Sequence, residues 1–341
     1  MRTLDWRRDA VELIDQTRLP HDEVVLRCET VTDLVDAIVR LSVRGAPALG
    51  VAGGYGVVLA ALANDPAADR PGFETGVGAL RAARPTAVNL ARMVDRVATV
   101  ARHSSAGTAA ESALAEAHRI RDEELAASVA MGERGADLVL ALVDRRPLRV
   151  MTICNTGGLA AVERGTALAV VQTLHERGEL AEALPVETRP LLQGARLTTW
   201  ELARMGAPHR LVVDSAGPVL LARGAVDVVV VGADRVAANG DVANKIGTFA
   251  LALGAAHAGV PFLVVAPEST VDPDTLAGGD IPIEDRGPDE VTHLGGVATA
   301  PAGTVAINPA FDVTPAALIT ALVTDRRVVT YPPATPPGLG R

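Results

Sequence analysis

The stretch Leu148-Arg-Val-Met-Thr-Ile-Cys154 opens a series of short apolar segments, rich in branched residues, that decides the fold. Four more segments follow: Val186-Glu-Thr-Arg189, Leu211-Val-Val-Asp214, Val226-Asp-Val-Val-Val-Val231 and Val260-Pro-Phe-Leu-Val-Val265. Helix-length segments separate them, at 159–177, 193–205, 215–223 and 243–258. Strands that alternate with helices form a parallel sheet with both faces covered. The spacing therefore predicts a doubly wound, Rossmann-like parallel sheet in an α/β protein.

The first third of the chain has helical spacing instead. Residues 31–40 carry apolar side chains at 34, 35, 38 and 39, and residues 87–101, 108–121 and 125–143 are also amphipathic. Short extended pieces around residues 2–6 and 23–27 predict a small antiparallel sheet. We expect a mostly helical N-terminal domain at residues 1–125 and a Rossmann-like catalytic domain at residues 126–341.

Length and composition limit the function classes. A chain of 341 residues suggests two domains at ~150 residues each. The net charge of −9 disfavours sequence-independent binding to nucleic acid or to an anionic membrane. The start lacks the apolar core of a signal peptide, and residues 226–231 are too short to cross a bilayer. Two cysteines, Cys28 and Cys154, exclude a disulfide scaffold. We expect a cytoplasmic protein.

In a doubly wound sheet, ligands bind beyond the carboxyl ends of the strands. The polar or reactive residues at those ends are Cys154, Arg189, Gln193, Asp214, Asp234 and Arg235. A cysteine that ends a buried strand is commonly an inert core residue. The glycine-containing loop Asn155-Thr-Gly-Gly158 equally allows its thiol to meet a substrate, so the residues alone leave both interpretations of Cys154 open.

Residues 232–248 form the densest polar segment. Asn239-Gly-Asp241 is a turn signal, and we expect a helix to begin near Val242 with Asp241 as its cap. Asn244 and Lys245 would then lie in the first turn, where free amides favour an anion. Lys245 is the only lysine among 32 basic residues. This favours an anionic ligand over a capped helix with a solvated lysine.

A second candidate is Arg44-Gly-Ala-Pro-Ala-Leu-Gly-Val-Ala-Gly-Gly-Tyr-Gly56. Pro47 suits the first position of a helix, which would leave the amides near Gly45 and Ala46 open beside Arg44. The segment is neither a P-loop nor a dinucleotide fingerprint, because it lacks Gly-Lys-Ser/Thr and follows no clear strand. Tight helix packing and phosphate binding explain its later glycines equally well.

These residues belong to a longer series of motifs, and with them the chain resembles the methylthioribose-1-phosphate isomerases. The motifs are Ile14-Asp-Gln-Thr-Arg-Leu-Pro20, Arg44-Gly-Ala-Pro47, Arg84-Pro-Thr-Ala-Val-Asn89, Cys154-Asn-Thr-Gly157, Glu187-Thr-Arg-Pro-Leu-Leu-Gln-Gly-Ala-Arg196, residues 232–248, Ala266-Pro-Glu-Ser-Thr-Val-Asp272, Ile281-Pro-Ile-Glu284 and Asn308-Pro-Ala-Phe-Asp-Val-Thr-Pro315. That family shares its fold with ribose-1,5-bisphosphate isomerases and with regulatory subunits of the translation-initiation exchange factor.

The resemblance implies an aldose–ketose isomerase that converts 5-methylthioribose 1-phosphate to 5-methylthioribulose 1-phosphate in methionine salvage. It places the catalytic pair on Cys154 and Asp234. It places the substrate contacts on Arg44, Gly45, Ala46, Arg84, Gln193, Asn244 and Lys245. It implies a homodimer and neither a metal nor an organic cofactor. The family commonly has histidine before the cysteine, where this chain has Ile153, so the choice of sugar is open.

The chemistry accounts for these residue types. A phosphate on the anomeric carbon prevents spontaneous ring opening, so an acid must protonate the ring oxygen. For Asp234 this calls for a raised pKa in a dry site. Cys154 would serve as base in an enediol path or stabilise a hydride shift, and both remain open. Alternative functions are isomerisation of 5-deoxyribose 1-phosphate or ribose 1,5-bisphosphate, or a non-catalytic regulatory subunit.

Overall fold

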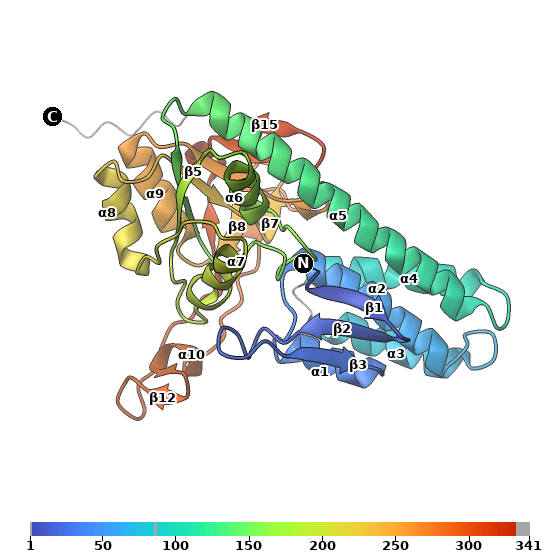
Figure 1. Cartoon of the computed structure of the whole chain (residues 1–341). Helices are drawn as coiled ribbons and strands as arrows, with labels where there is room; N and C mark the ends of the chain where they lie inside the picture. Colours follow the sequence, from blue (N-terminus) through green and yellow to red (C-terminus); the bar gives the residue numbers. More distant parts are fainter. Residues whose placement is uncertain (1, 85–86, 332–341) are drawn as a thin grey trace. The chain divides into compact units, whose positions relative to one another are not determined.

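The computed structural model describes residues 2–84 and 87–331, which form two compact units (Figure 1). The first unit comprises the residues up to Val129 together with Gly157–Gly165, and the second comprises Ala130–Thr156 and the residues from Thr166 on. The boundary at 129–130 lies within one long helix, α5 (Ala109–Leu142). The boundary proposed from the sequence, at 125–126, lies within the same helix.

The first unit combines a small antiparallel sheet with helices, as the sequence predicts. Its strands are β1 (Leu4–Arg7), β2 (Ala10–Ile14) and β3 (Val25–Cys28), in the order β1-β2-β3. The turn Arg8-Asp9 has φ angles of 49° and 61°, as a two-residue type I′ hairpin requires. Strand β2 was not predicted, since its alternation is broken by consecutive apolar residues.

The helices of this unit are α1 (Val31–Val39), α2 (Ala46–Ala63), α3 (Arg70–Ala82), α4 (Val88–His103) and the first part of α5. Thr30 and Asp33 form a capping box that starts α1. The predicted helices at 108–121 and 125–143 are one continuous helix, because no glycine or proline interrupts residues 122–124. Helix α3 was not predicted.

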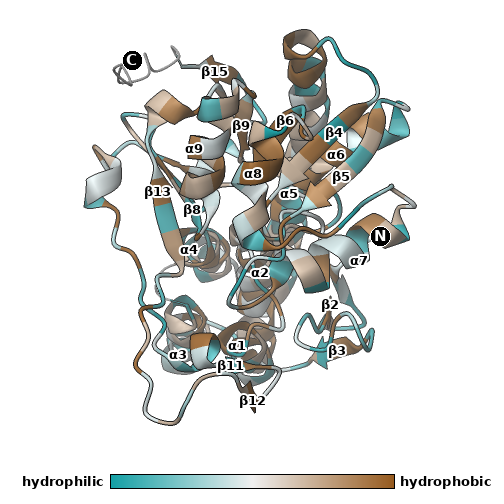
Figure 2. Cartoon of the chain, turned by 90° about the vertical axis from the view of Figure 1, so that its left-hand side faces the viewer, coloured by the Kyte–Doolittle hydropathy of each residue, from teal (hydrophilic) through white to brown (hydrophobic). Residues whose placement is uncertain are grey.

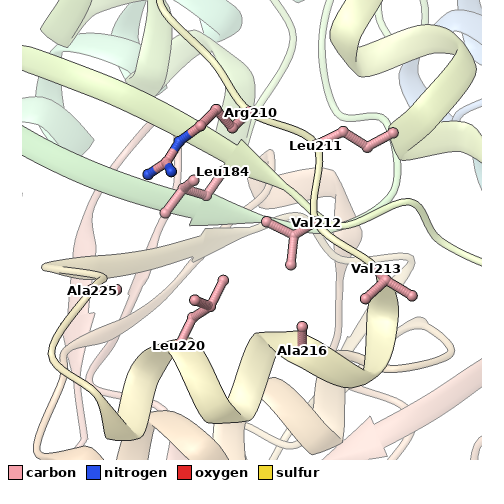
Figure 3. Close-up of a pocket in the computed structure, with 8 residues that line it drawn as sticks. All are labelled: Leu184, Arg210, Leu211, Val212, Val213, Ala216, Leu220 and Ala225. Atoms are coloured by element: carbon pink, nitrogen blue, oxygen red, sulfur yellow. The ribbon is translucent and has the colours of Figure 1, made fainter.

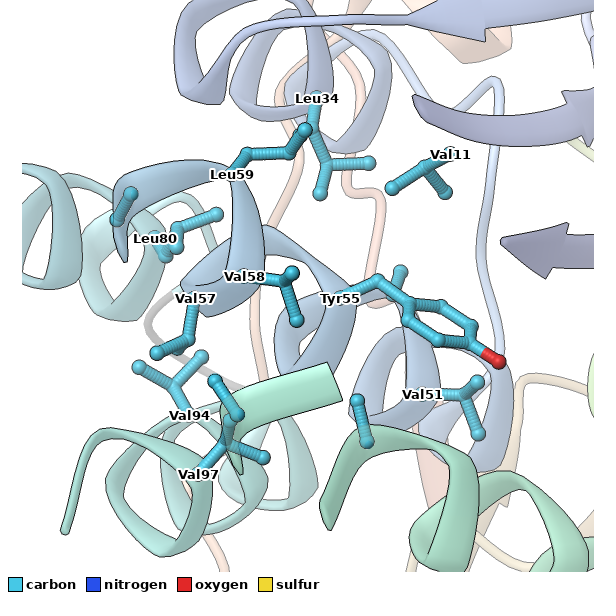
Figure 4. Packing of buried hydrophobic residues seen from close by; sticks show 14 of the residues in the cluster. Val11, Leu34, Val51, Tyr55, Val57, Val58, Leu59, Leu80, Val94 and Val97 are labelled. Carbon is cyan, nitrogen blue, oxygen red and sulfur yellow. The ribbon is translucent and has the colours of Figure 1, made fainter. Parts of the chain in front are cut away.

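Helix α2 is the centre of the first core (Figure 4). A Cβ on Gly53 would lie 2.6 Å from Leu90 Cδ1 and 2.8 Å from Val94 Cγ2. A Cβ on Gly56 would lie 2.5 Å from Leu80 Cδ2. These glycines therefore serve close helix packing, and not the approach of a phosphate. By length and composition α2 could also cross a membrane, but 78% of it is buried, the pattern of a core helix.

The second unit contains the predicted Rossmann-like sheet. In the described part of the chain it has six strands in the order β15-β14-β9-β6-β4-β5. Their bounds are β4 (Leu148–Thr152), β5 (Leu180–Pro185), β6 (Val228–Val231), β9 (Phe262–Val265), β14 (Ala321–Val323) and β15 (Val328–Thr330). All neighbouring pairs are parallel except β14–β15.

Both faces of this sheet are covered. Strands β6 and β9 consist only of hydrophobic residues (Figure 2). Every one of these residues is buried. Since successive side chains point to opposite faces, burial of all four residues of β6 requires helices on each side. The helices are α6 (Ala167–Glu176), α7 (Thr199–Arg204), α8 (Gly217–Ala222) and α9 (Thr248–Ala258), with a π-helical turn η1 (Gly194–Thr198) before α7 and a 3-10 turn η2 (Asp214–Ala216) before α8.

Two predicted strands are wrong. The second strand is Leu180–Pro185 and not 186–189, and residues 211–214 form no strand but only the isolated bridge between Val186 and Val212. The predicted helix at 159–177 begins at Ala167. Branched residues favour strands only weakly, and pairing with β4 selected the Leu-Ala-Glu-Ala-Leu-Pro segment instead.

A second sheet of the second unit was not predicted. Among the described residues it has the order β10-β7-β8-β13, with bounds β7 (Arg235–Ala237), β8 (Val242–Lys245), β10 (Val271–Asp272) and β13 (Phe311–Thr314). The chain continues through η3 (Glu268–Thr270), η4 (Gly278–Asp280), α10 (Asp289–Thr292), β11 (His293–Leu294), β12 (Val297–Ala298) and η5 (Ala316–Leu318). Residues 242–245 are therefore a strand and not the start of a helix.

Candidate active site

Cys154 lies two residues beyond β4, in an unusual backbone conformation. Its φ is +63° and its side chain is buried. Its backbone N–H donates to Thr188 Oγ1 at 2.9 Å, and its carbonyl accepts from Thr198 Oγ1 at 2.6 Å. A non-glycine residue holds a positive φ only where its surroundings enforce it. Two threonine hydroxyls from different segments thus fix the orientation of the cysteine.

Asp214 holds one of these threonines in place. Its carboxylate accepts from the backbone N–H of Thr188 and from that of Arg189, each at 2.7 Å. The Thr188 hydroxyl donates to the Val186 carbonyl at 2.9 Å, so its oxygen is oriented to accept from Cys154. Asp214, predicted as a residue at the ligand edge, is therefore part of the support of the Cys154 loop.

Gln193 lies beside the same loop. A Cβ on the next residue, Gly194, would lie 3.0 Å from Thr188 Oγ1. Gln193 is 3% exposed, and its Oε1 has no hydrogen-bond partner among the described residues. A buried polar atom without a partner costs ~1–3 kcal/mol, and native proteins rarely keep one without a reason. This oxygen is therefore available to accept a hydrogen bond from a ligand.

Asp234 follows β6 at the same edge of the sheet. Its backbone N–H donates to the Ala243 carbonyl at 2.9 Å, which links the end of β6 to β8. A Cβ on Gly232 would lie 2.8 Å from Thr156 Cγ2, two residues after Cys154. The side chain of Asp234 is exposed. The dry surroundings expected for this carboxyl are thus not present in the protein alone.

Asn244 and Lys245 lie on β8, and both are buried. Asn244 Nδ2 donates to Thr248 Oγ1 at 3.0 Å. Lys245 Nζ donates to the Ala310 carbonyl at 3.0 Å and lies 4.8 Å from the centroid of the Phe311 ring. The prediction that both occupy the first turn of a helix is wrong, because β8 pairs with β13.

A carboxylate of the protein itself, that of Asp312, caps the N-terminus of α9. Asp312 on β13 accepts from the backbone N–H of Gly247 at 2.7 Å and from that of Phe249 at 3.1 Å. Asp241, the predicted cap, instead accepts from Gly278 and Ala316, each at 3.0 Å. The carboxylate of Asp312 therefore occupies the position in which the sequence predicted an anionic ligand, and Lys245 offers its charge from a strand.

The remaining predicted contacts lie in the first unit. Gly45 precedes α2 with a φ of +93°, and a Cβ there would lie 2.2 Å from the Ala160 carbonyl oxygen, so only glycine fits. Asn89 Nδ2 donates to the Ala46 carbonyl at 3.2 Å. This bond brings the segment Arg44–Ala46 beside the start of α4, which follows Arg84. Two residues of the Arg84 motif, 85 and 86, lie outside the described residues.

Other candidates are less suited to chemistry. Burial raises the pKa of Cys28 to about 11, which keeps its thiol neutral. Across residues 2–84 and 87–331, no three His, Cys, Asp or Glu side chains gather as a metal site. A pocket of about 290 Å³ between β5 and α8 contains none of the predicted site residues (Figure 3). Its lining is Leu184, Arg210, Leu211, Val212, Val213, Ala216, Leu220 and Ala225.

The sequence pattern of the initiation factor 2 subunit family matches residues 42–330. The chain belongs to this family. One relative is the methylthioribose-1-phosphate isomerase of Chloroflexus aurantiacus, 48% identical over 97% of this chain and 96% of the relative. Another, from Nocardia farcinica, is named a probable bifunctional methylthioribose-1-phosphate isomerase/methylthioribulose-1-phosphate dehydratase; it is 51% identical, and the match covers 98% of this chain but 60% of the relative.

A third relative is the 5-deoxyribose 1-phosphate isomerase of Moorella thermoacetica, 47% identical over 96% of this chain and 94% of the relative. Two solved structures share the fold. The 5-methylthioribose 1-phosphate isomerase of Pyrococcus horikoshii has a TM-score of 0.89 and 39% identity, covering 96% and 92% of the chains. A structure from A. fulgidus, described as translation initiation factor eIF-2B subunit delta, has a TM-score of 0.86 and 40% identity, covering 97% and 96%.

The sequence did not point to three residues around the candidate site. Thr188 and Thr198 orient Cys154, and Asp312 holds the start of α9. Thr188 lies within the motif Glu187-Thr-Arg-Pro190, and Asp312 lies within Phe311-Asp-Val-Thr-Pro315. Both residues therefore belong to motifs of the resemblance, but the motifs did not indicate their roles. No local pattern reveals their partners, because each hydrogen bond joins segments 34 to 65 residues apart.

Proposed function

We propose that the chain is an aldose–ketose isomerase that converts 5-methylthioribose 1-phosphate to 5-methylthioribulose 1-phosphate, and so serves methionine salvage. The observation that carries this is the 48% identity to a methylthioribose-1-phosphate isomerase across nearly all of both chains. The oriented Cys154 and the unpartnered Gln193 oxygen support a ligand site at the carboxyl edge of the sheet.

The catalytic pair in this proposal is Cys154 and Asp234. Asp234 donates a proton to the ring oxygen and opens the sugar while the phosphate stays on the anomeric carbon. Because its carboxyl is exposed in the protein alone, the bound sugar itself must desolvate it and raise its pKa. Hydrogen then moves between the two adjacent carbons. Cys154 acts as base for an enediol path or stabilises the transition state of a hydride shift.

The substrate ligands in this proposal are the contacts that the family resemblance implies. Positive charge for the phosphate dianion comes from Lys245, Arg44 and Arg84, and the backbone amides at Gly45 and Ala46 supply donors. Gln193 and Asn244 hydrogen-bond the sugar or its phosphate. Neither a metal nor an organic cofactor takes part, since the chemistry needs only a proton donor, a base and charge for the phosphate.

Conversion of 5-methylthioribose 1-phosphate, followed by NMR, tests the proposal. Wild type should form the ketose, and Asp234→Asn and Cys154→Ala should each lower kcat at least ~100-fold, the low end for acid–base groups. Thermal unfolding of each variant shows whether it is folded. Near-normal turnover in either folded variant would contradict the assigned pair, and a folded wild type without activity would contradict the substrate.

The second candidate substrate is 5-deoxyribose 1-phosphate, favoured by the similarity to the isomerase of M. thermoacetica. Ile153 is buried in an apolar cluster with Cys154, which argues against a second phosphate as in ribose 1,5-bisphosphate. An apolar pocket can discriminate between a methylthio group and a methyl group by only ~1–3 kcal/mol of free energy. The ratio of kcat/KM for the three sugar phosphates decides between them, and a preference for the bisphosphate would overturn the assignment.

The oligomeric state and the cellular compartment of the protein are further parts of the proposal. We infer a homodimer in the cytoplasm with no nucleic-acid or membrane partner. Large apolar side chains support a protein interface: Val297, Val305 and Ile307 are 68%, 90% and 85% exposed. The net charge of −9 opposes binding to nucleic acid or an anionic membrane. A non-catalytic regulatory role would require a stable complex with translation proteins in a pull-down.

A further inference from the structure

Asp312 pairs directly with a proposed substrate ligand. In the antiparallel ladder of β8 and β13, Asp312 lies opposite Asn244, and Phe311 lies opposite Lys245. Opposite residues of a ladder project to the same face. Asp312 and Asn244 therefore share the face that meets the start of α9, whereas Lys245 extends on the other face, over the Phe311 ring.

Asp312 and Asn244 hold the same turn from β8 to α9. Asp312 accepts from Gly247 and Phe249, while Asn244 donates to the Thr248 hydroxyl. That hydroxyl donates to the Lys245 carbonyl at 2.6 Å. The turn is thus fixed at each position from 247 to 249, and the backbone of Lys245 is fixed with it.

The same turn reaches the neighbourhood of Cys154. Gly247 has a φ of +102°, and a Cβ there would lie 3.0 Å from Ile153 Cδ1. Only glycine suits this conformation and this approach. The turn therefore has the buried Ile153, the residue before Cys154, on one side and the strand of Asn244 and Lys245 on the other.

Burial of Asp312 disfavours the negative charge of its carboxylate. Burial raises the pKa of its carboxyl to about 6, while the N–H groups of Gly247 and Phe249 and the charge of Lys245 act to lower it. The charged groups on the elements packed against β13 are Lys245 on β8, Asp280 on η4 and His257 at the far end of α9. Protonation would remove the charged acceptor from the cap. It would also remove the charge of one carboxylate whose pKa the charge of Lys245 lowers; the carboxylate of Glu290 is another.

We propose that Asp312 is a positioning residue: from β13 it holds the turn of residues 245–249, and through that turn it sets the side chains of Asn244 and Lys245 for the substrate phosphate. This inference rests on the proposed function, since it takes Asn244 and Lys245 as substrate ligands. Asp312 itself touches neither sugar nor phosphate in this scheme, so its loss affects binding more than the chemical step.

Asp312→Asn tests the inference, with Asp241→Asn as the matched control. Asp241 also accepts from two backbone N–H groups, but from those of Gly278 in η4 and Ala316 in η5 and not from those of the turn. For 5-methylthioribose 1-phosphate, Asp312→Asn should raise KM on the order of 10-fold with kcat within about 3-fold, the pattern of lost uniform binding. Asp241→Asn should leave KM unchanged. An equal rise in both variants would overturn the inference.

The pH profile gives a second reading. Below pH 6 the substrate phosphate, with a second pKa of ~6, and Asp312 both gain a proton. The acid limb of wild-type kcat/KM should therefore show one more ionisation than the acid limb of Asp312→Asn, because the variant lacks the titrating carboxyl. Identical acid limbs in the two proteins would overturn the inference.

Hydrogen exchange separates this inference from the substrate assignment, because it needs no substrate. The amides of Gly247 and Phe249 should exchange at least ~10-fold faster in Asp312→Asn than in wild type, and unchanged protection would overturn the role of Asp312 whatever the substrate is. If Asp312→Asn does not fold, Thr248→Val breaks the other link of the turn, and a wild-type KM in that variant would overturn the inference.

Discussion

At the residue scale, the site combines one strained cysteine with one unsatisfied amide. Cys154 holds a φ of +63° through hydrogen bonds to two threonines, and Gln193 Oε1 is buried without a partner in the described chain. Both features cost free energy in the folded protein. Such costs are typical of groups that are set in place for a ligand.

Replacement of Gln193 should separate this role from stability. Gln193→Leu removes the unpaired oxygen, so we expect a Tm equal to or above that of wild type and a KM for 5-methylthioribose 1-phosphate raised on the order of 10-fold, as one lost hydrogen bond predicts. Thr152→Val is the matched control, because Thr152 Oγ1 is also buried and without a partner among the described residues. It should leave KM unchanged. A wild-type KM in Gln193→Leu would contradict the assignment of Gln193 as a substrate ligand.

At the element scale, helices α3 and α4 are joined by an ion pair whose effect depends on pH. Glu74 accepts two hydrogen bonds from Arg102, at 2.9 and 2.7 Å, and pairs with Arg70. The hydrogen bonds from Arg102 lower the pKa of its carboxyl to about 2. The side chain of Glu74 is 38% exposed, so we expect a contribution of ~1 kcal/mol to stability at neutral pH.

Glu74→Gln tests this contribution by chemical unfolding across pH. The pKa of the folded state lies below that of the unfolded state, so the stabilisation is complete above pH 4.5 and is lost as pH falls toward 2. The difference in unfolding free energy between wild type and Glu74→Gln should follow this course. An equal difference at pH 7 and pH 2.5 would mean that packing, and not the charge of Glu74, joins the helices.

At the scale of the whole molecule, the homodimer is the prediction to test. Light scattering coupled to size exclusion should give twice the mass of one chain at micromolar concentration. Val305→Asp places a charge at an apolar side chain that is 90% exposed, so it should leave Tm at low concentration unchanged and weaken the dimer. A monomeric wild type would contradict the predicted homodimer. A dimer that Val305→Asp leaves unaffected would mean that Val305 lies outside the interface.

The sequence of the whole chain predicted the fold class and the family. Apolar runs and helical spacing determined the fold class, because they record which faces must be buried, and both the helical N-terminal part and the mostly parallel sheet are confirmed. The motifs of residues 154–157 and 232–248 determined the family, since matches of this kind extend along nearly the full chain. No pairing between distant segments was needed for either result.

Only the tertiary structure decided what surrounds the candidate residues. Residues 242–245 became a strand because residues 311–314 pair with them, and the N-terminus of α9 received Asp312 in place of an anionic ligand. The exposure of Asp234 and the hydroxyls that orient Cys154 were decided in the same way. The physical reason is the same in each case. Hydrogen bonds and burial depend on partners far along the chain, whereas a sequence pattern records only the preferences of neighbouring residues.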